Sequence, residues 1–365
     1  MNSRAWKQSR IPLLLVAFMV MAIIGVIQSF RLPSEERQVT VGVILASSLA
    51  DRGWNEGHYS SLLHACQGHG CRLILREFVP EKQSELHTAV EELIQDGAQA
   101  IFLTSFGYGN YVSGLADRYP GVAFFSISGK GNAKNSTYYF SRLYQARYLA
   151  GIVAGAASRT GVLGFVAGMP NPQTNRNINA YAKGIRRANP EAKLIVHFIG
   201  SWDDEQKERK SVASMAAEGA DVITYHTDKP YAIREAEARN LFSTGYDAQY
   251  EQYSERFLTA ALYDWDVVYE KVLGDYLSGR VNMSQGYWLD MEEKGVRLSE
   301  LSPLVSEQTK ALVDAEYQRI RREGVFTGVI YDNKGRLRCD EGERISDRQL
   351  FNGMEWFVEG VAVHD

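Results

Sequence analysis

From residue 39 onwards, short apolar runs alternate with amphipathic stretches, and this alternation constrains the fold more than any other feature. Runs such as "VTVGVIL", "AQAIFLTSF" and "GVLGFVAG" are each followed by a stretch with helical spacing of apolar residues. Continuous apolar strands separated by helices are typical of parallel sheets that are covered on both faces. About eight or nine such units in roughly 250 residues are too many for one sheet, so the sequence predicts two doubly wound lobes.

Two similar segments, one in each half of the chain, support this division. "EELIQDGAQAIFLTSF" and "ASMAAEGADVITYHTD" each contain a helical stretch, a glycine, a small residue, an apolar strand and a polar turn. The chain after residue 250 is less regular. There, "SEQTKALVDAEYQRIRREG" predicts a long helix, and "VFTGVIYDNKGRLRC" predicts a hairpin that turns at residues 332–335.

The N-terminus has the layout of an export signal. Arg4, Lys7 and Arg10 precede "IPLLLVAFMVMAIIGVI", which is 17 residues without a charge. This run reaches the lower limit for spanning a bilayer. It lacks a small-residue cleavage site and a following lipoprotein-type cysteine, so we expect an uncleaved single-pass anchor rather than a cleaved signal. In either case the bulk of the chain is expected on the periplasmic or extracellular side of the cell membrane.

Three cysteines are compatible with export. Cys66 and Cys71 stand five positions apart in "CQGHGC", where a disulfide could close the loop in an oxidising compartment. The alternative is a metal site formed with His69, which would still need a fourth ligand. Cys339 is left over and expected to be a free thiol.

Charge and motifs exclude several classes of function. The 365 residues carry a net charge of −4, and the sequence has no basic stripe that would indicate nucleic-acid binding. It has no Walker loop, nucleophile elbow, zinc-protease motif or EF-hand. We therefore expect no enzymatic activity, no cofactor and no metal centre.

The polar turns that follow the predicted strands are the candidate binding region. In open α/β folds, ligands bind in the crevice outside the carboxyl ends of the strands. These turns carry aromatic rings beside hydrogen-bonding groups, namely Trp54, Asn55 and His58; Ser105, Phe106 and Tyr108; Trp202 and Asp203; His226, Thr227 and Asp228; Tyr246 and Asp247; and Asp264 and Trp265. Rings stack on flat ligands while carboxylates, amides and imidazoles recognise their polar edge. For any single aromatic residue, packing in the core is the alternative.

The first of these turns, "SSLADRGWNEGH", has two interpretations. Asp51 is a preferred type of helix-capping residue, and Trp54 could simply pack inward. The position after the first strand favours a binding loop in which Asp51 caps while Trp54, Asn55 and His58 face the ligand.

A series of motifs resembles the basic membrane protein family of substrate-binding proteins for ABC-type transporters, which includes purine-binding and nucleoside-binding members. The resemblance runs from about residue 39 to 361 and includes "DRGWNEGH", "TSFGY", "YPGVAFFSISG", "YLAGIVAG", "GVLGFVAGMPNPQTNRNINAYAKGIRRANP", "SWDDEQKE", "GADVITYHTDKP" and "MEWFVEGV". Single motifs are weakly specific, but their order along the chain is specific.

The resemblance implies a type I periplasmic-binding-protein fold, with two parallel-sheet lobes joined by a three-stranded hinge. It implies lobe 1 at residues 38–147 plus about 250–290 and lobe 2 at 148–249 plus about 291–365, after an N-terminal segment at 1–37. The implied ligand is a purine base or nucleoside, and the implied partner is an ABC permease. The implied ligand-binding residues are Asp51, Trp54, Asn55, His58, Ser105, Phe106, Trp202, Asp228 and Asp247.

Two departures from the family keep alternatives open. The lipoprotein cysteine is missing, so a membrane-anchored regulator of the same fold that senses ligand for a signalling partner is the second hypothesis. Asp264 stands where the family more usually has an asparagine, and an aspartate only accepts hydrogen bonds where an asparagine can also donate. A nucleoside hydrolase or phosphorylase that uses Asp51, His58 and Asp228 is the least favoured hypothesis.

Overall fold

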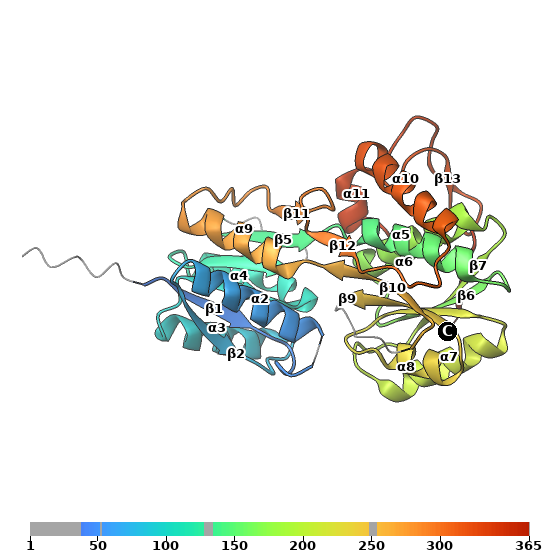
Figure 1. Ribbon diagram of the computed structural model, residues 1–365. Helices are drawn as coiled ribbons and strands as arrows, with labels where there is room; N and C mark the ends of the chain where they lie inside the picture. The colour runs from blue at the N-terminus through green and yellow to red at the C-terminus, as the bar shows by residue number, and fades with distance from the viewer. Residues whose placement is uncertain (1–37, 52, 128–133, 248–253, 365) are drawn as a thin grey trace, which may run out of the picture. The chain divides into compact units, whose positions relative to one another are not determined.

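The computed structural model describes residues 38–51, 53–127, 134–247 and 254–364 (Figure 1). Contacts group Thr40–Asp365 into one compact unit with its own buried cores, so we expect residues 38–365 to fold without the segment before them. Within the described ranges, no helix combines the length and the apolar composition needed to cross a bilayer. The predicted membrane anchor at residues 11–27 lies outside these ranges.

The first sheet has six strands, and all neighbouring pairs in it run parallel. Their order is β11 (Tyr287–Leu289), β5 (Ser136–Ser141), β4 (Ala123–Ile127), β3 (Ala100–Leu103), β1 (Thr40–Ile44) and β2 (Arg72–Arg76). Its helices are α2 (Trp54–Gly68), α3 (Gln83–Gln95), η1 (Phe106–Asn110), α4 (Val112–Arg118) and α9 (Trp265–Leu277).

Alternation along the strands explains why this sheet is covered on both faces. Ile101 and Leu103 of β3 pack into a core formed with residues of α3 and α4. Phe102, between them, points to the opposite face, where its ring centroid is 5.3 Å from that of Tyr269 in α9. Successive strand residues point to opposite faces, so a strand that is buried on both must be apolar throughout. The predicted doubly covered parallel sheet is confirmed here.

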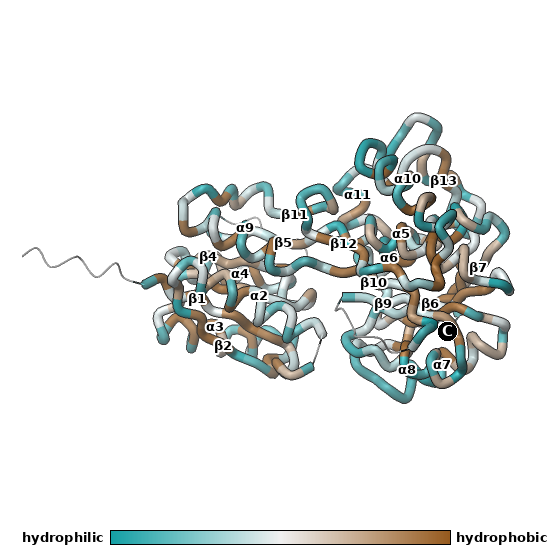
Figure 2. Tube along the Cα trace, viewed as in Figure 1, coloured by the Kyte–Doolittle hydropathy of each residue, from teal (hydrophilic) through white to brown (hydrophobic). Residues whose placement is uncertain are grey.

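The second sheet has seven strands and one antiparallel pair, β10 with β12. Their order is β12 (Val296–Leu298), β10 (Phe257–Tyr263), β9 (Phe242–Asp247), β8 (Val222–His226), β6 (Val162–Ala167), β7 (Lys193–Phe198) and β15 (Val361–His364). The helices around it are α5 (Leu143–Ala157), α6 (Pro172–Ala188), α7 (Glu205–Ala217), α8 (Tyr231–Ala238), α10 (Glu307–Glu323) and α11 (Asp347–Asn352). Figure 2 shows hydrophobic residues along β6 and hydrophilic residues around α8.

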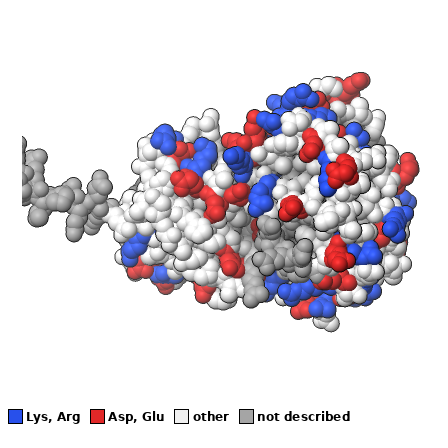
Figure 3. Space-filling view, in the orientation of Figure 1, with Lys and Arg blue, Asp and Glu red and all other residues white. Residues whose placement is uncertain are grey.

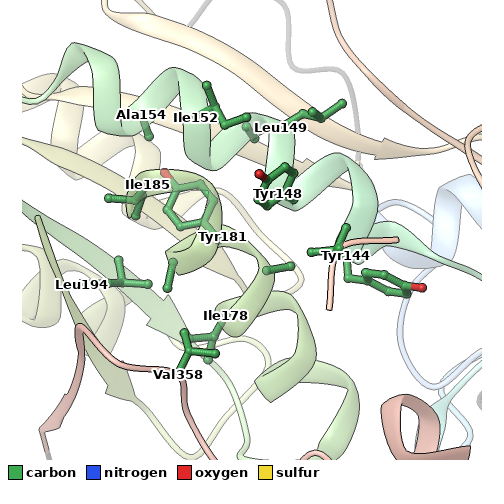
Figure 4. Close-up of a cluster of buried hydrophobic side chains, with 14 of the residues drawn as sticks. Tyr144, Tyr148, Leu149, Ile152, Ala154, Ile178, Tyr181, Ile185, Leu194 and Val358 are labelled. Carbon is green, nitrogen blue, oxygen red and sulfur yellow. The ribbon is translucent and has the colours of Figure 1, made fainter. Parts of the chain in front are cut away.

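Helices α5 and α6 pack with their backbones nearly in contact. A Cβ atom at Gly184 would lie 1.9 Å from the carbonyl oxygen of Tyr148, and one at Gly151 would lie 2.2 Å from that of Tyr181. Only glycine permits this approach. The apolar side chains around the contact, including Ile152 and Ile185, form the centre of the larger buried core (Figure 4).

The chain passes between the two sheets three times, from β5 to α5, from β10 to α9 and from β11 to β12. Backbone hydrogen bonds join these crossings, since Arg142 N–H donates to Leu289 O at 2.7 Å and Asp264 N–H donates to Gly295 O at 3.1 Å. This is the predicted three-stranded connection. The strand β10 pairs with β9 in the second sheet. The lobe boundaries predicted above include helices and loops as well as the strands of each sheet, and they stay a prediction.

The irregular C-terminal part contains both elements expected from its sequence. The long helix is α10, capped by Ser306, and the hairpin is β13 (Ile330–Tyr331) with β14 (Leu337–Cys339). Gly335, in the turn of this hairpin, has a φ of +76°, which residues with a side chain rarely adopt. Figure 3 shows Lys and Arg interspersed with Asp and Glu on the face in view, as expected for a nearly balanced net charge.

The cysteines depart from the disulfide hypothesis. Cys66, Cys71 and Cys339 are all free thiols in the structure. Burial, followed by the nearby Cys71, raises the pKa of Cys66 to about 12, so this thiol is held in its unreactive protonated form. His69, the third member of the alternative metal set, pairs with Glu270 at 2.9 Å.

Candidate ligand-binding site

The turn after β1 is organised around the carboxylate of Asp51. Its Oδ1 accepts hydrogen bonds from the N–H groups of Gly53 at 2.9 Å and Glu56 at 3.1 Å. Its Oδ2 accepts from Asn55 N at 2.9 Å and from Asn55 Nδ2 at 2.7 Å. Asp51 therefore satisfies the N-H groups at the start of α2, as a helix cap does. The capping role that the sequence left open is present, although the N-cap residue itself is Gly53 and Asp51 lies two positions before it.

Trp54 and Asn55 begin α2 and are held firmly. Trp54 Nε1 donates to Thr104 O, at the end of β3, at 2.8 Å, and the Trp54 side chain is half-buried. Asn55 is buried, and its Oδ1 has no hydrogen-bond partner among the described residues. A buried amide oxygen without a partner is costly, so this atom is suited to accept a hydrogen bond from an incoming group.

His58 lies inside a ring cluster rather than at its surface. It is 0% exposed, with its ring centroid 4.5 Å from Trp54 and 4.0 Å from Trp265. His58 Nδ1 is 2.7 Å from the hydroxyl of Tyr269, whereas His58 Nε2 has no partner within the described part of the chain. Burial lowers the pKa of His58 well below its usual value, so the ring is neutral. Direct contact of His58 with a ligand stays a prediction.

Tyr263 completes this ring cluster. Tyr263, the last residue of β10, stacks on Trp265 with ring centroids 4.5 Å apart. Tyr263 also lies 5.9 Å from Trp54, centroid to centroid. The cluster therefore joins α2 of the first sheet to β10 of the second.

The turn after β3 carries Ser105 and Phe106. Ser105 Oγ donates to Glu81 Oε1 at 2.5 Å, and Gly107 N–H donates to the same oxygen at 2.6 Å. Phe106 is half-buried at the start of η1. The Ser105 hydroxyl is thus already hydrogen-bonded to Glu81, in the loop between β2 and α3. The ligand contacts of Ser105 and Phe106 stay predictions.

The turns after β7 and β8 lie together. Asp228 N–H donates to Trp202 O at 2.8 Å, and the ring of Trp202 is 6.4 Å from that of His226. Trp202 also covers Gly168, where an added Cβ would lie 2.4 Å from the indole. Trp202 and Asp228 are both half-buried, so each retains an accessible surface.

Asp247 ends β9 in an unusual conformation. Its φ is +67°, in the left-handed region that few non-glycine residues adopt and that is common at functional sites. Its neighbour Tyr246 stacks on His226 with centroids 4.2 Å apart. Arg147 lies over the Tyr246 ring at 4.6 Å and donates to Thr224 Oγ1 at 3.0 Å and to Tyr225 O at 2.6 Å.

Three carboxylates at these turns act on one another. Burial, followed by the charge of Asp51, raises the pKa of Asp247 to about 7, although the charge of Arg147 opposes this. Burial, followed by Asp51 and Asp247, raises the pKa of Asp228 well above its usual value. Both effects disfavour the ionised form. A ligand group that donates hydrogen bonds to Asp228 and Asp247 would favour their ionised forms.

The structure thus brings Asp51, Trp54, Asn55 and His58 together with Trp265, and Trp202 together with Asp228 near Asp247. Sequence reasoning missed Arg147 and Tyr263. Arg147 is fully buried although it is charged, and it is the only charged residue in the apolar helix α5, which is the signal that could have found it. Tyr263 is recognised only through the ring contacts above.

Known proteins resemble this chain along most of its length. A putative ABC transporter glucose-binding protein of Haloferax volcanii is 31% identical over 90% of this chain and 82% of its own length. A purine-binding protein of Brucella abortus is 28% identical over 89% of this chain and 93% of its own length. A crystal structure of a transcriptional activator of the comK gene from Bacillus halodurans superposes with a TM-score of 0.69, at 23% identity, over 78% of this chain and 98% of that one.

The structural likeness shows the fold, a type I periplasmic-binding-protein fold as the resemblance implied. The family model for PnrA-like substrate-binding proteins of ABC transporters, Bmp, matches residues 38–328. Members of this family bind their substrates and do not transform them. With two mainly parallel sheets, three crossings and a match over most of its length, the chain belongs to the Bmp family of ABC transporter substrate-binding proteins.

Proposed function

We propose that the protein captures a purine base or purine nucleoside outside the cytoplasm and delivers it to an ABC permease. The observation that carries the ligand class is the set of mutually repelling carboxylates, Asp51, Asp228 and Asp247, beside the half-buried rings of Trp54 and Trp202. A purine offers flat faces for the rings and ring or exocyclic N–H groups for the carboxylates. The purine-binding relative of Brucella abortus supports the same ligand class.

Each residue has a proposed role. Trp54 and Trp202 supply the stacking faces, and Asp228 and Asp247 accept hydrogen bonds from ligand N–H groups. Asn55 Oδ1, which lacks a partner among the described residues, accepts another. Asp51 holds the loop, while His58 supports Trp54 from behind. Ser105 and Phe106 border the ligand from the turn after β3.

The test is a calorimetric titration of residues 38–365 with adenine, guanine, adenosine, inosine and D-glucose. The glucose arm is included because the relative in Haloferax volcanii carries that name. We expect a purine to bind with a dissociation constant below about 100 μM, which corresponds to roughly −5.5 kcal/mol. Glucose binding without purine binding would show that the ligand is a sugar and not a purine. No binding of any purine at millimolar concentration would contradict the purine proposal.

We further propose that residues 11–27 stay uncut and hold the protein at the cell membrane with the folded part outside. The basic flank and the missing cleavage site support this. Mass spectrometry of the chain recovered from membranes tests it. A mature N-terminus after residue 27 would show a cleaved signal instead.

A second candidate function is a membrane-anchored sensor, in which a regulatory partner detects ligand binding. The absent lipoprotein cysteine favours it, and so does the likeness to a transcriptional activator. Uptake of radiolabelled purine by a deletion strain separates the two. Uptake that falls to background supports transport, and unchanged uptake supports the sensor.

A further inference from the structure

Two histidines face each other at the edge of the second sheet, away from the site described above. The C-terminal strand β15 pairs in parallel with β7, and the register places His364 opposite His197. Paired residues on neighbouring strands share one face of the sheet. Their ring centroids are 5.8 Å apart.

A carboxylate from a third element joins this pair. Glu218 is the C-cap of α7, beside which β15 ends (Figure 1), and its Oε2 is 3.4 Å from His364 Nδ1. One ligand atom from each of His197, Glu218 and His364 lies within 4.8 Å of the others. Gly219, with a φ of +98°, turns the chain immediately after Glu218.

The exposure of the three side chains suits an ion that enters from solvent. The side chains of His364 and Glu218 are 42% and 39% exposed. His197 is half-buried, and its Nε2 has no hydrogen-bond partner within the described residues. The ion pair between His364 and Glu218 therefore does not account for the Nε2 of His197, which has no partner in the part of the chain that the structure describes. A metal ion would engage all three residues.

We propose that His197, Glu218 and His364 form a site for a divalent transition-metal ion, with Zn²⁺ as the best match. Imidazole nitrogen and carboxylate oxygen are ligands that Zn²⁺ prefers, and a set of three leaves a fourth position for water. Tetrahedral Zn²⁺ holds such atoms about 3.3 Å apart, so binding requires small rotations of the two exposed side chains. The ion would tie the C-terminal strand to β7 and to the end of α7.

The experiment uses residues 38–365 without a histidine tag, with Zn²⁺ and Co²⁺ as probes. We expect one Zn²⁺ per chain in equilibrium dialysis and a rise in melting temperature of about 3 °C at saturation. His197→Gln and His364→Gln should each weaken Zn²⁺ binding at least tenfold and abolish the thermal shift. Glu218→Gln should weaken binding less, because the amide oxygen is still a ligand.

The matched control is the double variant His69→Gln/Cys71→Ser, which removes another potential set of metal ligands. It should retain Zn²⁺ affinity. In the unchanged protein, bound Co²⁺ should show no thiolate charge-transfer band in the near ultraviolet, because no cysteine is a ligand. Two outcomes overturn the proposal. One is the absence of saturable Zn²⁺ binding below about 100 μM, and the other is binding that is lost in the control but kept in His197→Gln and His364→Gln.

Discussion

The turn after β1 and the turns after β8 and β9 have similar polar sequences but differ in how their polar groups are satisfied. In the first turn, both oxygens of Asp51 accept hydrogen bonds from its own loop, and Trp54 Nε1 donates to Thr104 O. In the other turns, Asp228 and Asp247 have raised pKa values and Asp247 occupies a left-handed conformation. The first turn is built mainly to hold shape, whereas the others keep carboxyl groups in surroundings that disfavour their ionised form.

This difference teaches which residues are available to a ligand. A carboxylate that already accepts several hydrogen bonds gains little from a new donor, whereas one whose ionised form is disfavoured by its surroundings gains more. Ligand recognition should therefore rest mainly on Asp228 and Asp247. The turn after β1 contributes a ring whose position is fixed by its surroundings.

Replacement of Trp54 should have the largest effect on stability. We expect Trp54→Ala to lower the free energy of unfolding by about 3 kcal/mol, because it removes an indole packed against His58 and Trp265 and a hydrogen bond to Thr104. Trp202→Ala, which removes a single ring neighbour, should cost about 1 kcal/mol. Urea unfolding measures both. If Trp54→Ala abolishes purine binding at unchanged stability, Trp54 is chiefly a ligand face and the comparison fails.

Replacement of Asp247 should affect binding more than stability. Asp247→Asn keeps the shape but loses the acceptor charge, so purine affinity should fall about 10- to 100-fold, the range of a charge-assisted hydrogen bond. Calorimetry at pH 8 measures the affinity, and thermal melting at the same pH should show no loss of stability. Trp356→Ala, a half-buried tryptophan on another part of the chain, is the control and should bind normally. An unchanged affinity in Asp247→Asn would remove Asp247 from the site.

The fold was predictable where burial leaves a local pattern. Strands β1, β3 and β6 are continuous apolar runs because both of their faces are covered, and the sequence showed them. Three strands were missed, β5, β10 and the four-residue β15. The short β15 is stabilised by its pairing with β7 rather than by local preference, so periodicity does not reveal it. Length does not explain the other two, because β5 has six residues and β10, an apolar run, has seven.

The same limit applies to the candidate site. The turns at strand ends could be placed by topology, which brings Asp228 and Asp247 to one edge of the second sheet. The enclosure of His58 could not be predicted, because it depends on Trp265 and Tyr269 from a helix about 200 residues later in the chain. Such contacts arise because the chain passes between the two sheets three times. No spacing of residues in a single sequence indicates where these passages occur.

The cap in the first turn should be worth about 1 to 2 kcal/mol, the usual cost of losing an N-terminal capping side chain. Asp51→Ala leaves the first N–H groups of α2 without their acceptor, and urea unfolding measures the loss. The same variant should lower the pKa values of Asp228 and Asp247, because the charge of Asp51 raises both. Carboxyl carbon NMR measures these pKa values. If they stay unchanged while stability falls, the two regions are electrostatically independent.

The last prediction concerns the pH dependence of stability that Asp247 introduces. An aspartate titrates near 3.9 when unfolded, whereas the pKa of Asp247 in the folded protein is raised to about 7. The folded state therefore binds the proton more tightly, so the contribution of Asp247 to stability is complete below about pH 4 and is lost as the pH rises to 7. Asp247→Asn should remove this downward slope, which unfolding at intervals from pH 4 to 8 measures. Because a bound purine that donates to Asp247 favours the ionised carboxylate, purine should flatten the slope of the unchanged protein as well. If the slope of stability against pH is the same in the variant and the unchanged protein, with and without purine, the titrating group is not Asp247. Asp247 would then resemble Asp51, whose hydrogen bonds are already satisfied within the protein.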